Sequence, residues 1–102
     1  MEYVHVAELK KRLEDVTGGV TLVDVRSPGE YADAHVDGSE NIPLQTIPQA
    51  IERLRTMQNL HLICASDNRS GMACQFLASA GVPAANVQGG LIAWQSAGFP
   101  LV

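Results

Sequence analysis

The chain has 102 residues, of which 46% are hydrophobic, and it carries a formal net charge of −4. This length suffices for one hydrophobic core without disulfide or metal cross-links, so we expect residues 1–102 to form a single domain. The acidic balance argues against nucleic acid or an anionic membrane surface as the main partner, and no apolar run reaches the length of a transmembrane helix.

The first half of the chain predicts a helix, a buried strand and a second helix. Apolar residues at helical spacing, with a supporting Glu8–Arg12 pair, predict a helix over residues 7–16. The nearly continuous apolar run over residues 20–25 is rich in β-branched residues and is typical of a parallel strand covered on both faces. The stretch Ser27-Pro28-Gly29-Glu30 reads as a capping box with proline at the first helical position, so a short helix is expected to begin there. The apolar stripe of the first helix comprises Leu9, Leu13 and Val16.

The second half of the chain repeats this pattern. The stretch Thr46-Ile47-Pro48-Gln49 reads as a second capping box that opens a helix. Residues 60–64 predict another buried strand, and the helix that follows it is expected to end at Gly81. A short strand over residues 85–87 then leads to a last helix that contains Trp94. The predicted apolar faces comprise Ile47, Ile51 and Leu54 in the first of these helices, and Ala73, Phe76, Leu77 and Ala80 in the second.

This alternation of strands and helices predicts an α/β fold in which a parallel sheet lies between two layers of helices. In such folds, ligands bind at the carboxyl ends of the strands. Cys64 ends one of the predicted strands, and Asp24 and Arg26 lie at the end of another. We interpret an ion pair with Glu30 as the main role of Asp24 and Arg26, with a place at the border of a site as the alternative. His35 is interpreted as a structural hydrogen-bonding residue that holds the following loop.

Three stretches of the sequence, in the same order, resemble motifs of the rhodanese-like domain family. The stretch LVDVRSPGEYADAHVDGSENIP is similar to the family's Asp-x-Arg strand end, Glu-Tyr helix and Asn-Ile-Pro segment. CASDNRS resembles its active-site loop, Cys-x-x-Gly-x-Arg-Ser, and VQGGLIAWQSAGFPL resembles its Gly-Gly…Ala-Trp…Ala-Gly-x-Pro ending. The resemblance covers nearly the whole chain and implies a three-layer α/β/α fold around a mostly parallel, five-stranded sheet.

The family resemblance implies sulfur transfer. Cys64 would take a sulfane sulfur from a donor, such as thiosulfate or a protein persulfide, and hold it as a persulfide. It would then pass the sulfur to cyanide in vitro, or to a small thiol or a thioredoxin-like protein in the cell. No cofactor is implied, and the three histidines and two cysteines lack the spacing of a metal site. The N-terminus does not resemble a signal peptide and two cysteines predict no disulfide framework, so a reducing cytoplasm is the simplest setting.

The loop after Cys64 has the chemistry that a cysteine nucleophile needs. A free cysteine has a pKa of about 8.5 and reacts only as the thiolate, which backbone N–H groups and the positive end of a helix dipole favour. Small side chains at the start of the loop let its backbone approach the sulfur, and Ser70 can donate a hydroxyl or cap the helix. Arg69 suits an anionic donor or a salt bridge that fixes the loop. The predicted binding loop comprises Ala65, Ser66, Asp67, Asn68, Arg69 and Ser70.

Asp67 departs from the family, which usually has glycine at this position. Aspartate tolerates the left-handed backbone region better than most residues, so we expect the loop geometry to survive. A carboxylate about 6 Å from the thiolate would disfavour it by roughly 0.7–2.8 kcal/mol, which argues against fast turnover with anionic thiosulfate, while Cys64 remains the expected nucleophile. If the loop amides point inward, the side chains point outward, where Arg69 is expected to neutralise the Asp67 carboxylate.

Three other interpretations remain open. In the first, Cys64 is a buried structural thiol, which is the usual state of a cysteine in an arbitrary protein. In the second, the chain is a non-catalytic binding or regulatory module; the presence of Cys64 argues against it, whereas the changed loop keeps it open. The third is a phosphatase or arsenate reductase, whose loops have one more residue between cysteine and arginine than the four found here. Cys74, in the next helix, is predicted to be a core residue rather than a resolving thiol.

Overall fold

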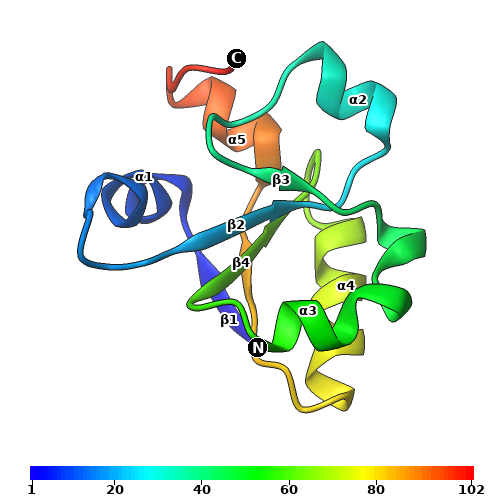
Figure 1. Ribbon diagram of the computed structural model, residues 1–102. Coiled ribbons are helices and arrows are strands. Elements are labelled where there is room, and N and C mark those ends of the chain that lie inside the picture. The colour runs from blue at the N-terminus through cyan, green and yellow to red at the C-terminus, as the bar shows by residue number, and fades with distance from the viewer.

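Five strands and five α-helices alternate along the computed structural model, which describes residues 1–102 (Figure 1). Their bounds are β1 (Glu2–Val4), α1 (Val6–Glu14), β2 (Thr21–Asp24), α2 (Pro28–Asp33), β3 (Glu40–Asn41), α3 (Ile51–Arg55), β4 (Leu60–Ile63), α4 (Asn68–Ser79), β5 (Ala85–Val87) and α5 (Gly90–Ser96). Two short 3-10 helices, η1 (Leu44–Thr46) and η2 (Pro48–Ala50), lie between β3 and α3. None of these helices combines the length and the apolar character needed to cross a membrane.

The strands form one sheet in the order β1-β5-β4-β2-β3, and every neighbouring pair is parallel. The expected α/β/α fold with a five-stranded sheet is therefore confirmed, and the sheet is wholly rather than mostly parallel. The central strands β2 and β4 pair along their whole length, from Thr21 opposite Leu60 to Asp24 opposite Ile63. Parallel pairing places their carboxyl ends, and the loops that follow them, side by side at one end of the sheet.

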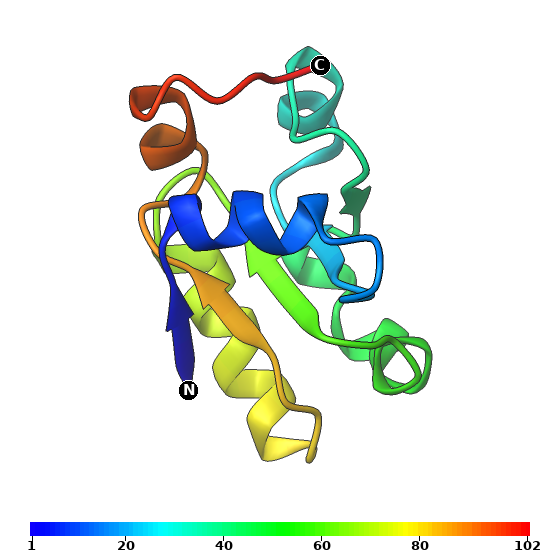
Figure 2. The same cartoon turned by 90° about the vertical axis from the view of Figure 1, so that its left-hand side faces the viewer.

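Helices cover both faces of this sheet. α1 and α5 pack on one face, and α3 and α4 pack on the other (Figure 1, Figure 2). In β2, Leu22 faces α1 and α5, whereas Val23 faces the opposite helical layer. In β4, Leu62 and Ile63 alternate between the two layers in the same way. The prediction of strands covered on both faces is confirmed by this alternating burial.

The first helix ends earlier than its apolar spacing predicts. α1 stops at Glu14, and Val16 is 96% exposed in the turn that follows. The carboxylate of Asp15 accepts hydrogen bonds from the backbone N–H of Thr17 at 3.0 Å and from its hydroxyl at 2.6 Å. These local bonds stabilise a turn in place of another turn of helix.

The capping box predicted at Thr46 is absent. The Thr46 hydroxyl donates to the carbonyl oxygen of Pro43 at 2.8 Å, and no side chain caps η2 or α3. The chain instead forms the two 3-10 helices before α3 begins. The predicted stripe is nevertheless largely correct, because Ile47 and Leu54 are buried and Ile51 is half-buried.

α4 buries a different face from the one predicted. Its buried residues are Ser70, Ala73, Cys74 and Leu77, which follow the i, i+3, i+4, i+7 spacing of a helix packed on a sheet. Phe76, predicted to be in this stripe, is 42% exposed. The stripe is difficult to recognise in the sequence because its first member, Ser70, is polar. The prediction that Cys74 is a core residue is confirmed.

Candidate active site

Cys64 is the first residue after β4, and its side chain lies in the core between the sheet and α4. Only 1% of the residue is exposed, so a reagent must bring a narrow group to the sulfur. The sulfur lies 3.1 Å from Oγ of Ser70, and the same hydroxyl lies 3.4 Å from the carbonyl oxygen of Asp67. The Ser70 hydroxyl can therefore donate to a thiolate, or accept from the thiol and donate to Asp67.

The backbone of the loop is oriented by α5. The carbonyl oxygens of Cys64 and Ala65 accept hydrogen bonds from the N–H groups of Leu91 at 2.9 Å and Ile92 at 3.1 Å. In a planar trans peptide, the N–H group points opposite to the carbonyl. The N–H groups of Ala65 and Ser66 therefore point away from α5. Because the Cys64 side chain packs on the face opposite α5, these two donors are directed to the side of the sulfur.

The loop contains backbone donors that the protein itself does not use. None of the N–H groups from residue 65 to residue 70 donates to a protein acceptor. The first group that does so is the N–H of Gly71, 2.9 Å from the carbonyl oxygen of Asp67. The last three of the free groups belong to the first turn of α4, where such donors are left unpaired by the helix itself. A set of unpaired N–H groups of this kind is suited to an anion.

Gly90 allows α5 to pack directly against this loop. A Cβ atom at Gly90 would lie 2.5 Å from the carbonyl oxygen of Ser66 and 2.7 Å from the carbonyl carbon of Ala65. The residue also has a φ of +57°, in the left-handed region that favours glycine. From the sequence, Gly89 and Gly90 predict only a tight turn, because the partner of a close backbone contact cannot be inferred from one segment.

The expected pairing of Asp67 with Arg69 is wrong. Oδ1 of Asp67 accepts a hydrogen bond from the N–H of Gly89 at 2.8 Å, in the turn between β5 and α5. The side chain therefore ties the loop to that turn, which agrees with the outward orientation predicted for it. Its backbone φ of −126° lies outside the left-handed region, so the position does not require the glycine that is usual in the family.

Arg69 instead pairs with Glu30 of α2. Its Nη1 lies 2.6 Å from Oε1 and its Nη2 lies 3.0 Å from Oε2 of Glu30, which is a bidentate arrangement. The hydrogen bonds from Arg69 lower the pKa of Glu30 to about 2, and the same contact raises the pKa of Arg69. Glu30 also accepts from the N–H of Ser27 at 3.1 Å, which completes the predicted capping box of α2. Glu30 thus links α2 to the loop, a role that its local sequence does not reveal.

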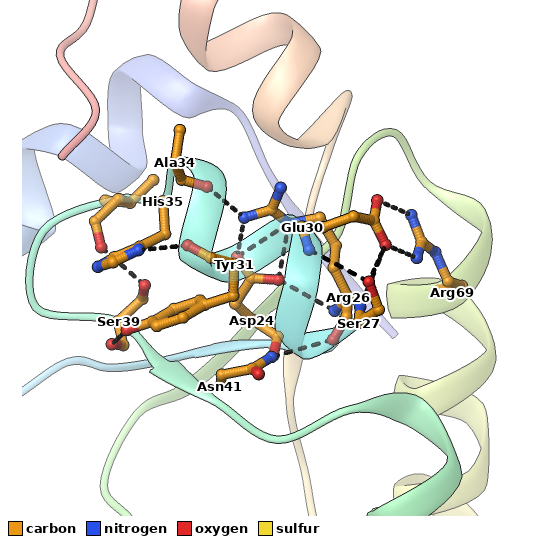
Figure 3. Close-up of polar contacts among 11 residues, drawn as sticks. Asp24, Arg26, Ser27, Glu30, Tyr31, Ala34, His35, Ser39, Asn41 and Arg69 are labelled. Atoms are coloured by element: carbon orange, nitrogen blue, oxygen red, sulfur yellow. Dashed lines mark hydrogen bonds and ion pairs between the residues drawn. The ribbon is translucent and has the colours of Figure 1, made fainter.

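Arg26 does not bind Glu30, and the ion pair expected between them is wrong. The Arg26 guanidinium donates to the buried carboxylate of Asp24, with Nη2 at 2.7 Å, and also to the carbonyl oxygen of Ala34 at 2.7 Å (Figure 3). Asn41 of β3 donates to the carbonyl oxygens of Asp24 at 2.9 Å and Arg26 at 3.0 Å. This buried cluster fixes the end of β2 and leaves Glu30 free to bind the loop.

His35 has structural contacts on the same side of the molecule. Its ring stacks on that of Tyr31, with centroids 3.7 Å apart, and its Nδ1 lies 2.7 Å from the Tyr31 carbonyl oxygen. The Tyr31 hydroxyl in turn donates to the carbonyl oxygen of Ser39 (Figure 3). These contacts support the interpretation of His35 as the residue that holds the loop before β3.

Two cavities lie at opposite ends of the sheet. One of about 230 Å³ adjoins the loop and is lined by Arg26, Glu30 and Ala65 among others. The larger, of about 730 Å³, lies near the amino ends of the strands and is lined by His61 and Cys74 among others. Burial raises the pKa of Cys74 to about 12, so its thiol stays protonated at neutral pH. The smaller cavity borders the loop through Ala65, the residue after Cys64, and Cys64 itself lines neither cavity.

Comparison with known proteins agrees with this geometry. Residues 5–97 match the Rhodanese-like domain family. A sulfurtransferase of Allochromatium vinosum is 35% identical over 95 residues, which cover 92% of this chain and 88% of that protein. The uncharacterized protein slr1261 of Synechocystis sp. is 41% identical over 85 residues, and the chain spans about half of its length, 47%. The crystal structure of a rhodanese-related protein from Thermoplasma volcanium has a TM-score of 0.88 at 30% identity, with 100% of this chain and 98% of that one covered.

The matched range contains most of the three sequence motifs, including the end of β2, the Cys64 loop and the turn that begins α5. The family match rests on the sequence, and the likeness to the Thermoplasma volcanium structure rests on the fold. Both agree with the position of Cys64 at the carboxyl end of a central strand. The chain therefore belongs to the rhodanese-like domain family.

Proposed function

We propose that the protein is a sulfurtransferase in which Cys64 carries the transferred sulfur. The observation that supports this best is the position of the sulfur beside a loop whose N–H groups, from residue 65 to residue 70, have no protein acceptor. The Ser70 hydroxyl, 3.1 Å from the sulfur, adds a further donor. Such donors stabilise a thiolate and, after transfer, a persulfide anion. The sulfurtransferase among the relatives supports the same chemistry.

The first half-reaction loads Cys64. Its thiolate attacks the outer, sulfane sulfur of the donor, and a bond forms between Sγ and that sulfur. The S–S bond of the donor breaks, and its electron pair leaves with sulfite when the donor is thiosulfate, or with a thiolate when the donor is a persulfide. No oxidant is consumed, because the sulfane sulfur moves from one sulfur atom to another. The N–H groups of residues 65–70 then hold the outer sulfur.

The second half-reaction unloads Cys64. An acceptor nucleophile attacks the outer sulfur of the persulfide, and the electron pair of the broken S–S bond returns to Sγ. Cyanide serves as this acceptor in vitro, and a small thiol or a thioredoxin-like protein serves in the cell. Because the donor product leaves before the acceptor reacts, the steady-state kinetics are expected to be ping-pong.

Intact-protein mass spectrometry after incubation with thiosulfate tests this function. We expect a gain of one sulfur atom that a reducing thiol removes and that the Cys64→Ala variant lacks. Cys74→Ala is the matched control, because a thiol with a pKa of about 12 stays protonated and its removal should leave the adduct in place. An adduct that persists in Cys64→Ala, or is lost in a folded Cys74→Ala, would contradict the assignment.

A folded protein that gains no sulfur from thiosulfate or from any persulfide, despite a free Cys64 thiol, would favour the non-catalytic module. The phosphatase alternative is tested in the same samples with p-nitrophenyl phosphate. We expect no hydrolysis, because the four residues between Cys64 and Arg69 form a shorter loop than phosphatases of this kind use.

A further inference from the structure

Both arginines at the candidate site are already paired. Arg69 belongs to the loop, but its two terminal nitrogens bind Glu30, at 2.6 and 3.0 Å. Arg26 lines the adjoining cavity, but its guanidinium binds the buried carboxylate of Asp24 and the carbonyl oxygen of Ala34. Neither guanidinium therefore retains an uncompensated positive charge for an anionic donor.

Two further carboxylates border the site without a cationic partner. Asp67 lies in the loop, and its carboxylate accepts the N–H of Gly89 at 2.8 Å. Asp33 lines the cavity beside the loop. Neither takes part in an ion pair. We refer to Asp24, Glu30, Asp33 and Asp67 as the carboxylate border. Its four formal negative charges exceed the two positive charges of Arg26 and Arg69, so the formal charge of this group of residues is negative.

Access to the sulfur is also narrow. Cys64 is 1% exposed and lines neither of the two cavities; the one of about 230 Å³ reaches the loop only at Ala65. A linear persulfide presents a single sulfur atom at its end. Thiosulfate, in contrast, is a dianion whose charge is shared by its sulfane sulfur and its three oxygens, and it brings this charge toward the carboxylate border. Repulsion between these charges opposes the approach of thiosulfate, whereas a persulfide that reacts in its protonated form, R–S–SH, brings no charge on its sulfane sulfur.

We propose, on the basis of the function above, that the donor is a persulfide with no anionic group near its sulfane sulfur, and that the carboxylate border selects against thiosulfate. The Cys64 thiolate bonds to the outer sulfur of R–S–SH, and the S–S bond of the donor breaks. The electron pair leaves with the inner sulfur, which takes the proton and departs as the thiol R–SH. Cys64 is left as a persulfide anion beside the N–H groups of the loop.

Three small persulfides allow the effect of the donor's charge on the loading rate to be measured with the reacting group kept the same. Those of cysteamine, 2-mercaptoethanol and 3-mercaptopropionate share the reacting group and carry a positive, a neutral and a negative end. We expect the second-order rate of Cys64 loading, followed by mass spectrometry at low salt, to fall about threefold at each step of this series. Thiosulfate is expected to react most slowly, and its rate is expected to rise with salt, because salt screens the repulsion.

Two charge-removing variants test whether the carboxylate border causes this selection. Glu30→Gln retains the acceptor of the capping box, and Asp67→Asn retains an acceptor for the N–H of Gly89. In the double variant, we expect the ratio of the thiosulfate rate to the 2-mercaptoethanol persulfide rate to rise about three- to tenfold. Glu52→Gln is the matched control: its side chain is 85% exposed on α3, away from the loop, and its loss should leave the ratio unchanged.

Equal loading rates for the three persulfides would overturn this inference, and so would a thiosulfate rate that falls with salt. An increase of the ratio in Glu52→Gln equal to that in the double variant would also overturn it, because the overall charge would then be the cause. Loading of Cys64 by none of the four donors would overturn the proposed function itself, so the two failures are distinguishable.

Discussion

The Asp67 carboxylate accepts a hydrogen bond from the Gly89 amide, 2.8 Å away, and so joins the residue before α4 to the turn that begins α5. The N–H groups of Leu91 and Ile92, in the first turn of α5, hold two carbonyl oxygens of the same loop. α5 and the turn before it therefore hold the loop at three points, two through the loop backbone and one through a side chain. A glycine at position 67 could make only the two backbone contacts.

Removal of the Asp67 contact should loosen the loop. We expect Asp67→Ala to lower the free energy of unfolding by about 1 kcal/mol, because the N–H of Gly89 loses its acceptor. Asp67→Asn should retain most of that stability, since an amide oxygen can accept the same bond. Urea unfolding of both variants measures the difference. Equal losses in the two variants would mean that the charge, and not the hydrogen bond, stabilises the loop.

A methyl group at Gly90 should displace the loop. Gly90→Ala places a Cβ within 2.5 Å of the Ser66 carbonyl oxygen, so we expect a loss of about 3 kcal/mol or more, and loss of sulfur loading in the fraction that folds. Gly38→Ala is the control, because Gly38 also has a positive φ, +85°, but has open space around it. That variant should cost about 1–2 kcal/mol and load normally. Similar effects of both substitutions on loading would contradict the packing argument.

The Arg69–Glu30 pair predicts a dependence of stability on acid. The pKa of Glu30 is lowered in the folded protein from 4.5 to about 2, so its stabilisation is present above pH 4.5 and is lost as the pH falls toward 2. The pair is partly exposed, so we expect it to contribute less than about 1 kcal/mol. Thermal unfolding of the protein and of Glu30→Gln should differ at pH 6 and converge near pH 2. A difference that stays constant with pH would rule out ionisation of Glu30 as its source.

Asn86 carries a buried polar atom without a partner. The residue is 1% exposed in β5, and its Oδ1 has no hydrogen bond. We expect Asn86→Leu, which has a similar shape, to raise the free energy of unfolding by about 1–3 kcal/mol, because it removes the cost of burying an unsatisfied group. Asn86→Asp is expected to lower it, because a charge is costlier to bury. Destabilisation by Asn86→Leu in urea would contradict this expectation.

The fold was largely accessible from the sequence, because the central strands lie in nearly continuous apolar runs and alternate with segments of helical spacing. β5 lies over the predicted residues, Ala85–Val87, and β2 and β4 lie within their predicted ranges. β1 and β3 are different. They have only three and two residues, and both lack an apolar run, so sequence patterns do not mark them. Their strand conformation depends on the neighbours with which they pair.

The place of the candidate loop in the fold, between a strand and a helix, was predictable, and its contacts were less so. Cys64 and its loop could be recognised because a reactive residue and a strand end are local features. The sequence did not predict that Glu30 pairs with Arg69 and not with Arg26, because either guanidinium could bind a carboxylate. Only the relative positions of α2, β2 and α4 decide which arginine reaches the carboxylate. The same reason applies to Gly90, whose close contact lies on a distant segment.

The position of β1 in the sheet has a consequence for the synthesis of the protein. β1 pairs only with β5, in a register that places Glu2 opposite Ala85. During synthesis on the ribosome, β1 therefore has no strand to pair with until β5 has emerged, and only α5 follows β5 among the described elements. Closing so long a segment costs chain entropy before any pairing compensates for it, so we expect β1 to dock late. The nascent protein can form its β2–β4 centre first, but its sheet is complete only once β5 has left the exit tunnel.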